Sequence, residues 1–390
     1  MNPISTNRIQ SLDLLKGLVM IIMALDHTRD YFHAAAFYFN PTDPAITTWP
    51  IFLTRWITHY CAPVFCFLAG ISAFLVGRKK NTRELSSFLL IRGIWLIIVQ
   101  MILVNFAWTF DVSFRYSELS VIWSLGISMI VLAALVHWSK TAILVFSILV
   151  IFGHNLLDSV HFENNSWWAI LHESGPIRFS QEYVLYVAYP LIPWMAVMSL
   201  GYYFGALYDK QVPVIVRKKT LTIIGISCIA LFIILRWSNL YGDLSTWENY
   251  NSASKTLMSF LAVTKYPPSL TFLLMTLGPS FLLLANAENL RGWIVNFFST
   301  FGRVPFFYYI IHLYLIHFLA GIVARLTGYG WHMMVLPDWV TDVPLLKGYG
   351  FRLWGVYFIW IIVIGLLYPL CRWFDAYKLN HKEKWWLSYL

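Results

Sequence analysis

Long apolar stretches recur along the whole chain of 390 residues, and they constrain its fold more than any other feature. A helix needs about 20 apolar residues to cross roughly 30 Å of hydrocarbon, and the chain has room for many such spans. Hydrophobic residues make up 59% of the sequence and charged residues only 12%, a composition that few water-soluble folds share. Because lipid cannot satisfy free backbone hydrogen-bonding groups, each stretch must be helical. We therefore expect an all-α, polytopic transmembrane helix bundle.

The apolar runs predict about ten membrane-spanning helices. These are expected near residues 12–33, 49–77, 85–110, 118–138, 141–158, 183–208, 220–237, 268–286, 303–327 and 349–374. A further stretch, 291–303, places Trp and Phe side chains along one face with Arg at both ends, which is typical of a short amphipathic helix lying in the membrane interface. The small-residue pattern GYYFG at 201–205 favours close packing of two helices. We expect a single integral-membrane domain over residues 1–390.

Basic residues mark one side of this bundle. The GRKKNTRE loop at 77–84, the RKK sequence at 217–219 and the C-terminal tail all fall on the same side of a ten-helix count. Short loops rich in Lys and Arg stay in the cytoplasm, so both termini are expected there. The longer loops near 159–182, 238–267 and 328–348 then face outward, and the polar 238–267 segment is a candidate for recognising carbohydrate. The net charge of +9 reflects these loops, so no nucleic-acid partner is expected.

Several function classes lack their sequence signature here. The four cysteines, Cys61, Cys66, Cys228 and Cys371, form no CxxC or Cys/His zinc spacing, so neither a disulfide framework nor a metal is expected. The chain has no Walker A sequence and no GxGxxG. Residues 34–36 resemble the cleavage site of a signal peptide, but ionisable residues separate them from the apolar core, so the first helix is expected to be retained.

Ionisable residues gather at the end of the first predicted helix, in ALDHTRDYFH at 24–33. Charged side chains inside a membrane helix cost about 2.5–3.5 kcal/mol each, so this group indicates either a polar interior or a function. One stripe of the helix, spaced i, i+3, i+4 and i+7, carries Asp26, Arg29, Asp30 and His33. The cluster is open to two interpretations: a neutralised set of ion pairs, or a carboxylate, Asp30, that orients His27 as a general base or nucleophile.

Other predicted helices bring polar groups to comparable depth. They carry Arg55, His59, Asn105, Trp108, Thr109, Asp111, His154, Asp158, His312 and His317. A lipid-facing bundle has no reason to bury so many histidines, so their number indicates a functional interior. Buried Asp and His chains are equally natural in a proton-coupled transporter or permease, and a non-catalytic membrane scaffold is a third alternative.

The first helix, RIQSLDLLKGLVMIIMALDH, resembles that of the heparan-alpha-glucosaminide N-acetyltransferase-like bacterial membrane proteins, within the transmembrane acyltransferase superfamily. The likeness continues through FLTRWITHYCAPVFCFLAGISAFL and FGRVPFFYYIIHLYLIH. The spacing of Asp13 and His27 matches the superfamily, whose first helix carries a catalytic histidine. The catalytic histidine of the animal enzyme is better matched by His33. The choice between the two stays open, with His27 favoured by the spacing and by Asp30.

The resemblance implies an enzyme that moves an acyl group, expected to be acetyl, from cytoplasmic acyl-CoA to an amino or hydroxyl group of an extracytoplasmic sugar. It implies a location in the bacterial cytoplasmic membrane, among lipid, and leaves the acceptor and any homo-oligomer open. The candidate catalytic residues are His27, Asp26, Asp30, Arg29 and His33. The candidate substrate-binding residues are Arg55, His59, Asn105, Trp108 and His312. Candidates to bind the CoA phosphates from the basic face are Lys16, Arg78, Arg83, Arg92 and Arg303.

Overall fold

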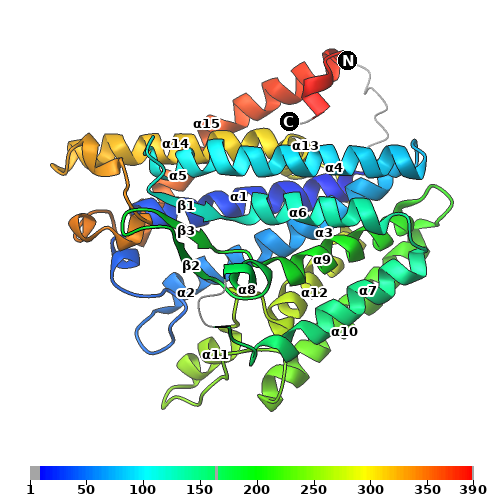
Figure 1. The fold of residues 1–390 in the computed structure, drawn as a ribbon, viewed down its shortest axis with the longest axis horizontal. Helices are drawn as coiled ribbons and strands as arrows, with labels where there is room; N and C mark the ends of the chain where they lie inside the picture. Colours follow the sequence, from blue (N-terminus) through cyan, green and yellow to red (C-terminus); the bar gives the residue numbers. More distant parts are fainter. Residues whose placement is uncertain (1–8, 163–165, 389–390) are drawn as a thin grey trace.

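The computed structural model describes residues 9–162 and 166–388 and consists mainly of long helices that lie side by side (Figure 1). The ten principal segments are α1 (Gln10–Phe32), α2 and α3 (Trp49–Trp56 and Cys61–Gly77), α4 and α5 (Thr82–Val99 and Asn105–Thr109), α6 (Val121–Leu135), α7 (Lys140–Gly153), α9 (Leu191–Phe204), α10 (Val214–Ser238), α12 (Leu270–Ala287), α14 (Pro305–Leu326) and α15 (Leu353–Asn380). Each corresponds to one predicted helix. The prediction of an all-α polytopic membrane bundle is confirmed.

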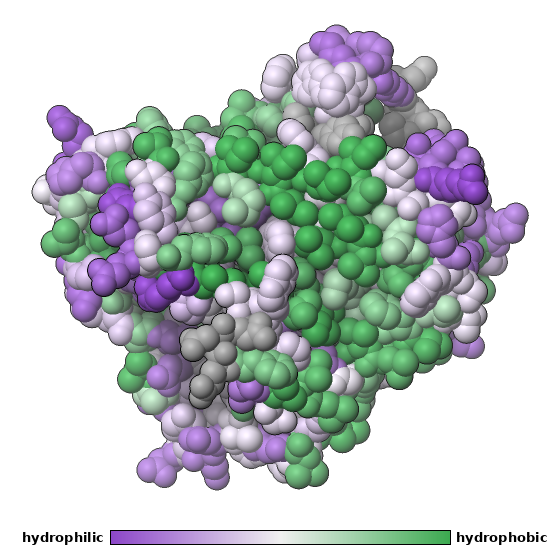
Figure 2. Space-filling model, viewed as in Figure 1, coloured by the Kyte–Doolittle hydropathy of each residue, from purple (hydrophilic) through white to green (hydrophobic). Residues whose placement is uncertain are grey.

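Eight segments among the described residues are long and apolar enough to cross a membrane: Trp49–Gly77, Thr82–Thr109, Lys140–Leu157, Leu191–Tyr208, Val214–Ser238, Leu270–Ala287, Pro305–Leu326 and Leu353–Asn380. α6 is apolar but shorter. α1 has 23 residues and carries several charges, and it packs against α3, α12, α13, α14 and α15 in the interior of the bundle. Figure 2 shows hydrophobic side chains across the middle of one face and hydrophilic ones towards its ends, as a bilayer requires.

Two predicted helices begin later than expected, and this part of the prediction is wrong. Residues of the predicted starts at 118 and 183 belong instead to β1 (Tyr116–Leu119) and β3 (Val184–Val187), which with β2 (Gly175–Arg178) form a sheet of order β1-β3-β2. β1 and β3 are parallel, with Tyr116 opposite Val184, whereas β2 and β3 are antiparallel. The sequence VLYV favours a strand, and Pro190 delays the next helix until Leu191. A hydropathy window cannot separate such strands from the apolar helices that follow them.

The predicted amphipathic stretch is helical over α13 (Trp293–Arg303). Trp293 is exposed, while the opposite face of α13 lies directly on α1. A Cβ on Gly17 would lie 1.8 Å from the carbonyl oxygen of Phe298, and one on Gly302 would lie 1.9 Å from that of Asp13. The two backbones are therefore in contact through paired glycines, and this contact fixes the position of α1 along its axis relative to α13. The position of α13 in the membrane interface stays a prediction.

The GYYFG pattern packs α9 against α3, as its small residues predicted. A Cβ on Gly201 would lie 2.0 Å from the Phe67 carbonyl oxygen, and Gly205 meets the Phe74 ring. All four cysteines are free: Cys61, Cys66 and Cys371 are buried and Cys228 is half-buried. Neighbouring helices thus associate through close backbone contact without cross-links.

Candidate functional site

A cavity of about 700 Å³ lies at the Phe32 end of α1. Asp26, His27, Arg29 and Asp30 line it from α1, together with residues of all three strands and of the loops near 36–41, 265–266 and 338–342. Four of the five predicted catalytic residues therefore share one cavity. The small sheet, which sequence analysis did not predict, supplies part of its wall.

His27 is held by a second histidine. Its Nδ1 lies 2.8 Å from Nε2 of His312 on α14, and Nδ1 of His312 lies 3.0 Å from the carbonyl oxygen of Tyr308. A carbonyl oxygen only accepts, so Nδ1 of His312 carries the hydrogen, and in neutral His312 the Nε2 is the acceptor. His27 must then donate from Nδ1. The lone pair of neutral His27 is consequently on Nε2, the nitrogen that His312 does not engage.

Aromatic side chains fix the ring plane of His27. Trp108 meets it edge-on, with ring centroids 4.8 Å apart and an interplanar angle of 71°. Tyr31 stacks on Trp108 and donates from its hydroxyl to the Trp108 carbonyl oxygen at 2.5 Å. His27 is thus clamped between His312 and Trp108, two of the five residues predicted to bind substrate.

The remaining ionisable groups of α1 form an ion-pair cluster. Asp26 accepts from Nη1 of Arg55 at 2.5 and 2.6 Å and lies 3.2 Å from Arg29, which also contacts Asp30 at 2.5 Å. Two carboxylates and two guanidinium groups neutralise one another, so the ion-pair interpretation describes these residues. Asp30 bonds to Arg29, whereas the partner of His27 is His312. The sequence spacing of His27 and Asp30 did not reveal this, because His312 is 285 residues away.

Four predicted catalytic or substrate-binding residues lie outside the lining of this cavity: His312, which contacts His27 from behind the wall, and His33, Asn105 and His59. His33 is buried where α1 ends, next to Phe351. Asn105 accepts at Oδ1 from Nε2 of Gln100 and from the backbone N–H of Glu118, so it ties α5 to β1. His59 lines a neighbouring cavity of about 520 Å³, which shares Arg55 with the first.

Sequence analysis missed several groups in the main cavity, notably Glu118 and Lys265. Sequence analysis counted Glu118 into an apolar helix, whereas it lies on β1, in the wall of the cavity. Burial raises the pKa of Glu118 to about 8, with a further contribution from the charge of Asp30, while Lys265 acts in the opposite direction. Glu118 is therefore mostly protonated at neutral pH and can donate a hydrogen bond into the cavity.

Glu118→Gln should flatten the pH dependence of stability. The pKa of Glu118 is higher in the folded protein than the ordinary value of 4.5, so the folded state is relatively more stable at a pH below 4.5. This stability is lost as the pH rises towards about 8, where the carboxyl must ionise in its buried position. Thermal unfolding of the detergent-solubilised protein across that range measures the effect. An unchanged slope in the variant would contradict the assignment.

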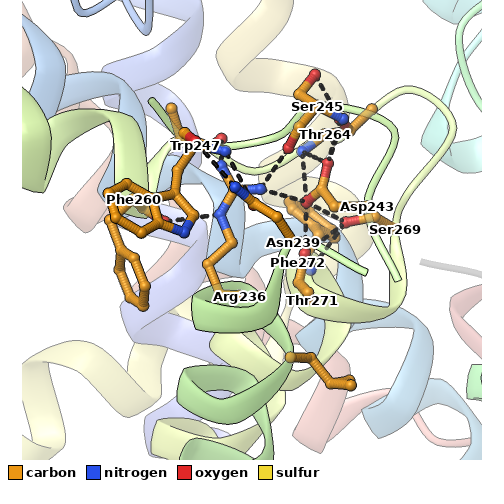
Figure 3. A network of polar contacts seen from close by, with 12 residues as sticks. Arg236, Asn239, Asp243, Ser245, Trp247, Phe260, Thr264, Ser269, Thr271 and Phe272 are labelled. Carbon is orange, nitrogen blue, oxygen red and sulfur yellow. Dashed lines mark hydrogen bonds and ion pairs between the residues drawn. The ribbon is translucent and has the colours of Figure 1, made fainter. Parts of the chain in front are cut away.

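An arginine inside the bundle organises the loop that carries Lys265. Arg236, at the end of α10, donates to the carbonyl oxygens of Ser245, Phe260, Ser259 and Ala262 (Figure 3). Next to it, the carboxylate of Asp243 accepts from the side chains of Thr264, Ser269 and Thr271. These hydrogen bonds hold the predicted outward segment 238–267, which includes α11 (Ala253–Leu261), beside the cavity around His27 and the neighbouring cavity that His59 lines.

A third cavity, mostly apolar and about 450 Å³ in volume, approaches the one around His27 from the other end of α1. Lys16 and Arg92 line it together with apolar side chains of α3, α4, α6 and α14. Val121 and Tyr309 line both this cavity and the one around His27, so these two side chains lie between them. Together the cavities follow α1 from Lys16 to His27.

The other three predicted CoA-binding residues lie elsewhere. Arg78 pairs with Asp209 at 3.0 Å, and Arg303 pairs with Asp375 at 2.6 Å. Arg83 is exposed on the first turn of α4. Of the five basic candidates, the structure brings Lys16 and Arg92 to a cavity.

The chain matches a protein-family model. The model for heparan-alpha-glucosaminide N-acetyltransferase, catalytic, matches residues 8–237, which is more than half of the chain. The matched region runs from α1 almost to the end of α10 and contains His27, Arg55 and Glu118. No curated protein matches this chain.

Proposed function

Since the chain belongs to the heparan-alpha-glucosaminide N-acetyltransferase catalytic family, we propose that it transfers an acetyl group from cytoplasmic acetyl-CoA to an amino or hydroxyl group of an extracytoplasmic sugar. One observation carries the proposal: two cavities that lie towards opposite ends of α1 share Val121 and Tyr309 in their walls, and His27 lines one of them. A donor in the apolar cavity and an acceptor in the His27 cavity would approach each other across these two side chains.

His27 is the base in this proposal. Its Nε2 takes the proton of the acceptor amine or hydroxyl while the acceptor atom attacks the thioester carbonyl carbon. The C–S bond then breaks, the acetyl group stays on the acceptor, and the CoA thiolate receives the proton from His27. Transfer through an acetyl-His27 intermediate uses the same residue and stays open. The Nε and Nη1 groups of Arg29 have no hydrogen-bond partner among the described residues, so they are candidates to stabilise the oxyanion.

The basic loops support the orientation that this reaction needs. Short Lys/Arg-rich loops favour the cytoplasm, which places Lys16 and Arg92 towards that side and the His27 cavity towards the outside. CoA phosphates would remain near the cytoplasmic face, with the slender pantetheine arm in the apolar cavity. The same proposal places both termini in the cytoplasm and α13 in the membrane interface. It also treats the chain as one domain and locates it in the bacterial cytoplasmic membrane.

The direct test incubates the purified, detergent-solubilised protein with labelled acetyl-CoA and a panel of amino sugars. Transfer of label to a sugar is the expected result. Proton-coupled uptake into vesicles without any use of thioester would instead favour a transporter. Absence of both transfer and uptake would favour a non-catalytic scaffold.

Ala69→Trp should close the donor route. Ala69 lines the apolar cavity, so an indole at this position takes the space proposed for the pantetheine arm, and the KM for acetyl-CoA should rise by about 10-fold or more, which corresponds to about 1.4 kcal/mol of lost binding. Ile94→Trp is the matched control, because Ile94 is exposed on α4 outside that cavity. Equal KM values for the two variants would contradict the route.

His312→Leu should lower kcat by about 10-fold or more, because His27 loses the acceptor that fixes its tautomer. His312→Gln keeps a carbonyl oxygen that can accept from His27 and should recover part of the activity. Single-turnover acetyl transfer with both variants measures this. Equal loss in the two would indicate that His312 only fills space.

A further inference from the structure

We propose that His154, Asp158 and His172 form a binding site for a divalent transition metal of the zinc class. One candidate ligand atom from each residue lies within 4.8 Å of the other two. His154 begins the short turn His154–Leu157 at the end of α7, and His172 follows α8 (Ser166–Leu171). None of the three lines the cavity around His27, so the site is separate from the proposed reaction.

Both imidazoles are buried, and three of their four ring nitrogens lack a hydrogen-bond partner among the described residues. His154 is 2% exposed and His172 is 1% exposed. Neither ring nitrogen of His154 has a hydrogen-bond partner within residues 9–162 and 166–388, and the same holds for Nδ1 of His172. A buried polar group that lacks a partner destabilises the fold. A metal ion would use the free lone pair of His154 and remove that penalty.

Asp158 completes the ligand set. Its Oδ1 lies 3.0 Å from Nε2 of His172, and its Oδ2 accepts from Nδ2 of Asn155 at 2.7 Å. Two ligands at about 2.0–2.1 Å from a tetrahedral zinc are roughly 3.3 Å apart, close to the His172–Asp158 separation. Asn155 in turn accepts at Oδ1 from the backbone N–H of Leu270, which anchors this turn to α12. Such hydrogen bonds to a ligating carboxylate are typical of metal sites.

The ligand chemistry selects the class of metal. Two imidazoles and one carboxylate suit zinc and its neighbours, whereas magnesium and calcium prefer oxygen alone. Three protein ligands leave a fourth position for water. Sequence analysis expected no metal because the cysteines have no zinc-binding spacing. It did not consider His172, which lies 14 residues beyond Asp158 and outside any short motif.

The site has a structural consequence for the acceptor cavity. His172 lies three residues before β2, and Pro176 and Arg178 of that strand line the cavity around His27. A metal would fasten the end of α7 to the segment that leads into this wall. The role of the metal ion is therefore to hold the sheet in place, and the ion takes no part in the acetyl transfer.

Binding of Zn²⁺ to the full-length, chelator-treated protein in detergent tests the proposal. Calorimetry should give one Zn²⁺ per chain, and Co²⁺ should show the visible absorption of a tetrahedral site. Loss of a ligand in His154→Ala, Asp158→Asn or His172→Ala should weaken binding by at least about 100-fold, since loss of an outer contact alone costs about 10–100-fold. His161→Ala is the control, because His161 is 72% exposed and pairs with Glu173 nearby.

Absence of stoichiometric Zn²⁺ binding by the unsubstituted protein would overturn the proposal. Equal affinity in the ligand variants and in His161→Ala would do the same, because it would show adventitious binding to surface histidines. If a ligand variant does not fold, the Co²⁺ spectrum of the unsubstituted protein still decides, since a site with octahedral water ligands absorbs only weakly. These outcomes are independent of acetyl transfer.

Discussion

His27→Ala lowers kcat for acetyl transfer by about 10²–10⁴-fold, the contribution that a positioned general base makes. The hydrogen bonds from Tyr308 through His312 leave the lone pair of His27 on Nε2, so the alanine variant has no group there to take the acceptor proton. Single-turnover transfer from labelled acetyl-CoA measures the loss. Thermal unfolding of the same sample shows that the fold is intact.

His33→Ala is the matched control for this experiment. His33 is the other histidine of the cluster, yet it is buried beside Phe351 and does not line the cavity. It should retain most of the activity. A larger loss in His33→Ala than in His27→Ala would reverse the assignment and leave the His27–His312 pair as packing.

Arg29→Met destabilises the fold by about 3–5 kcal/mol, because removing one partner leaves a buried charge unpaired. Arg29 lies between Asp26 and Asp30, and its side chain is 5% exposed. Without it, Asp26 keeps its ion pair with Arg55, whereas Asp30 loses the ion pair that it makes with Arg29. The temperature of unfolding in detergent, compared with that of the unsubstituted protein, reports the difference.

Arg115→Met is the matched control, because it removes an arginine from an exposed ion pair instead of a buried one. Arg115 pairs with Asp111 at 2.7 Å, but its side chain is 39% exposed, and pairs at the surface contribute about 0–1 kcal/mol. A small shift in Arg115→Met beside a large one in Arg29→Met is expected. Similar shifts in both would show that the α1 cluster is well solvated.

Hydropathy predicted the long helices because an apolar stretch in lipid must satisfy its own backbone hydrogen bonds, which a helix does. It misplaced the starts at 118 and 183, since a short strand before a helix has the same apolar composition. Helical periodicity on α1 brought Asp26, Arg29 and Asp30 together correctly, because residues three and four apart share a face. Contacts between distant segments have no such local signal, so the sequence did not reveal the partner of His27.

The basic candidates show the same limit. Lys16 and Arg92 line the apolar cavity, but Arg78 and Arg303 pair with Asp209 and Asp375. Net charge predicts which face of the bundle is basic, and it does not tell which cation is neutralised by a neighbour. Lys265 reaches the main cavity only through a loop that Arg236 holds in place.

The ion-pair cluster also bears on how the chain enters the bilayer during synthesis. Taken alone, the end of α1 would bring Asp26, Arg29 and Asp30 into lipid with one uncompensated negative charge. Insertion of each charged group costs about 2.5–3.5 kcal/mol. The compensating cation is Arg55, which emerges from the ribosome later, on the next helical segment. The first hairpin, rather than the first helix, is therefore the smallest unit that can rest stably in the membrane.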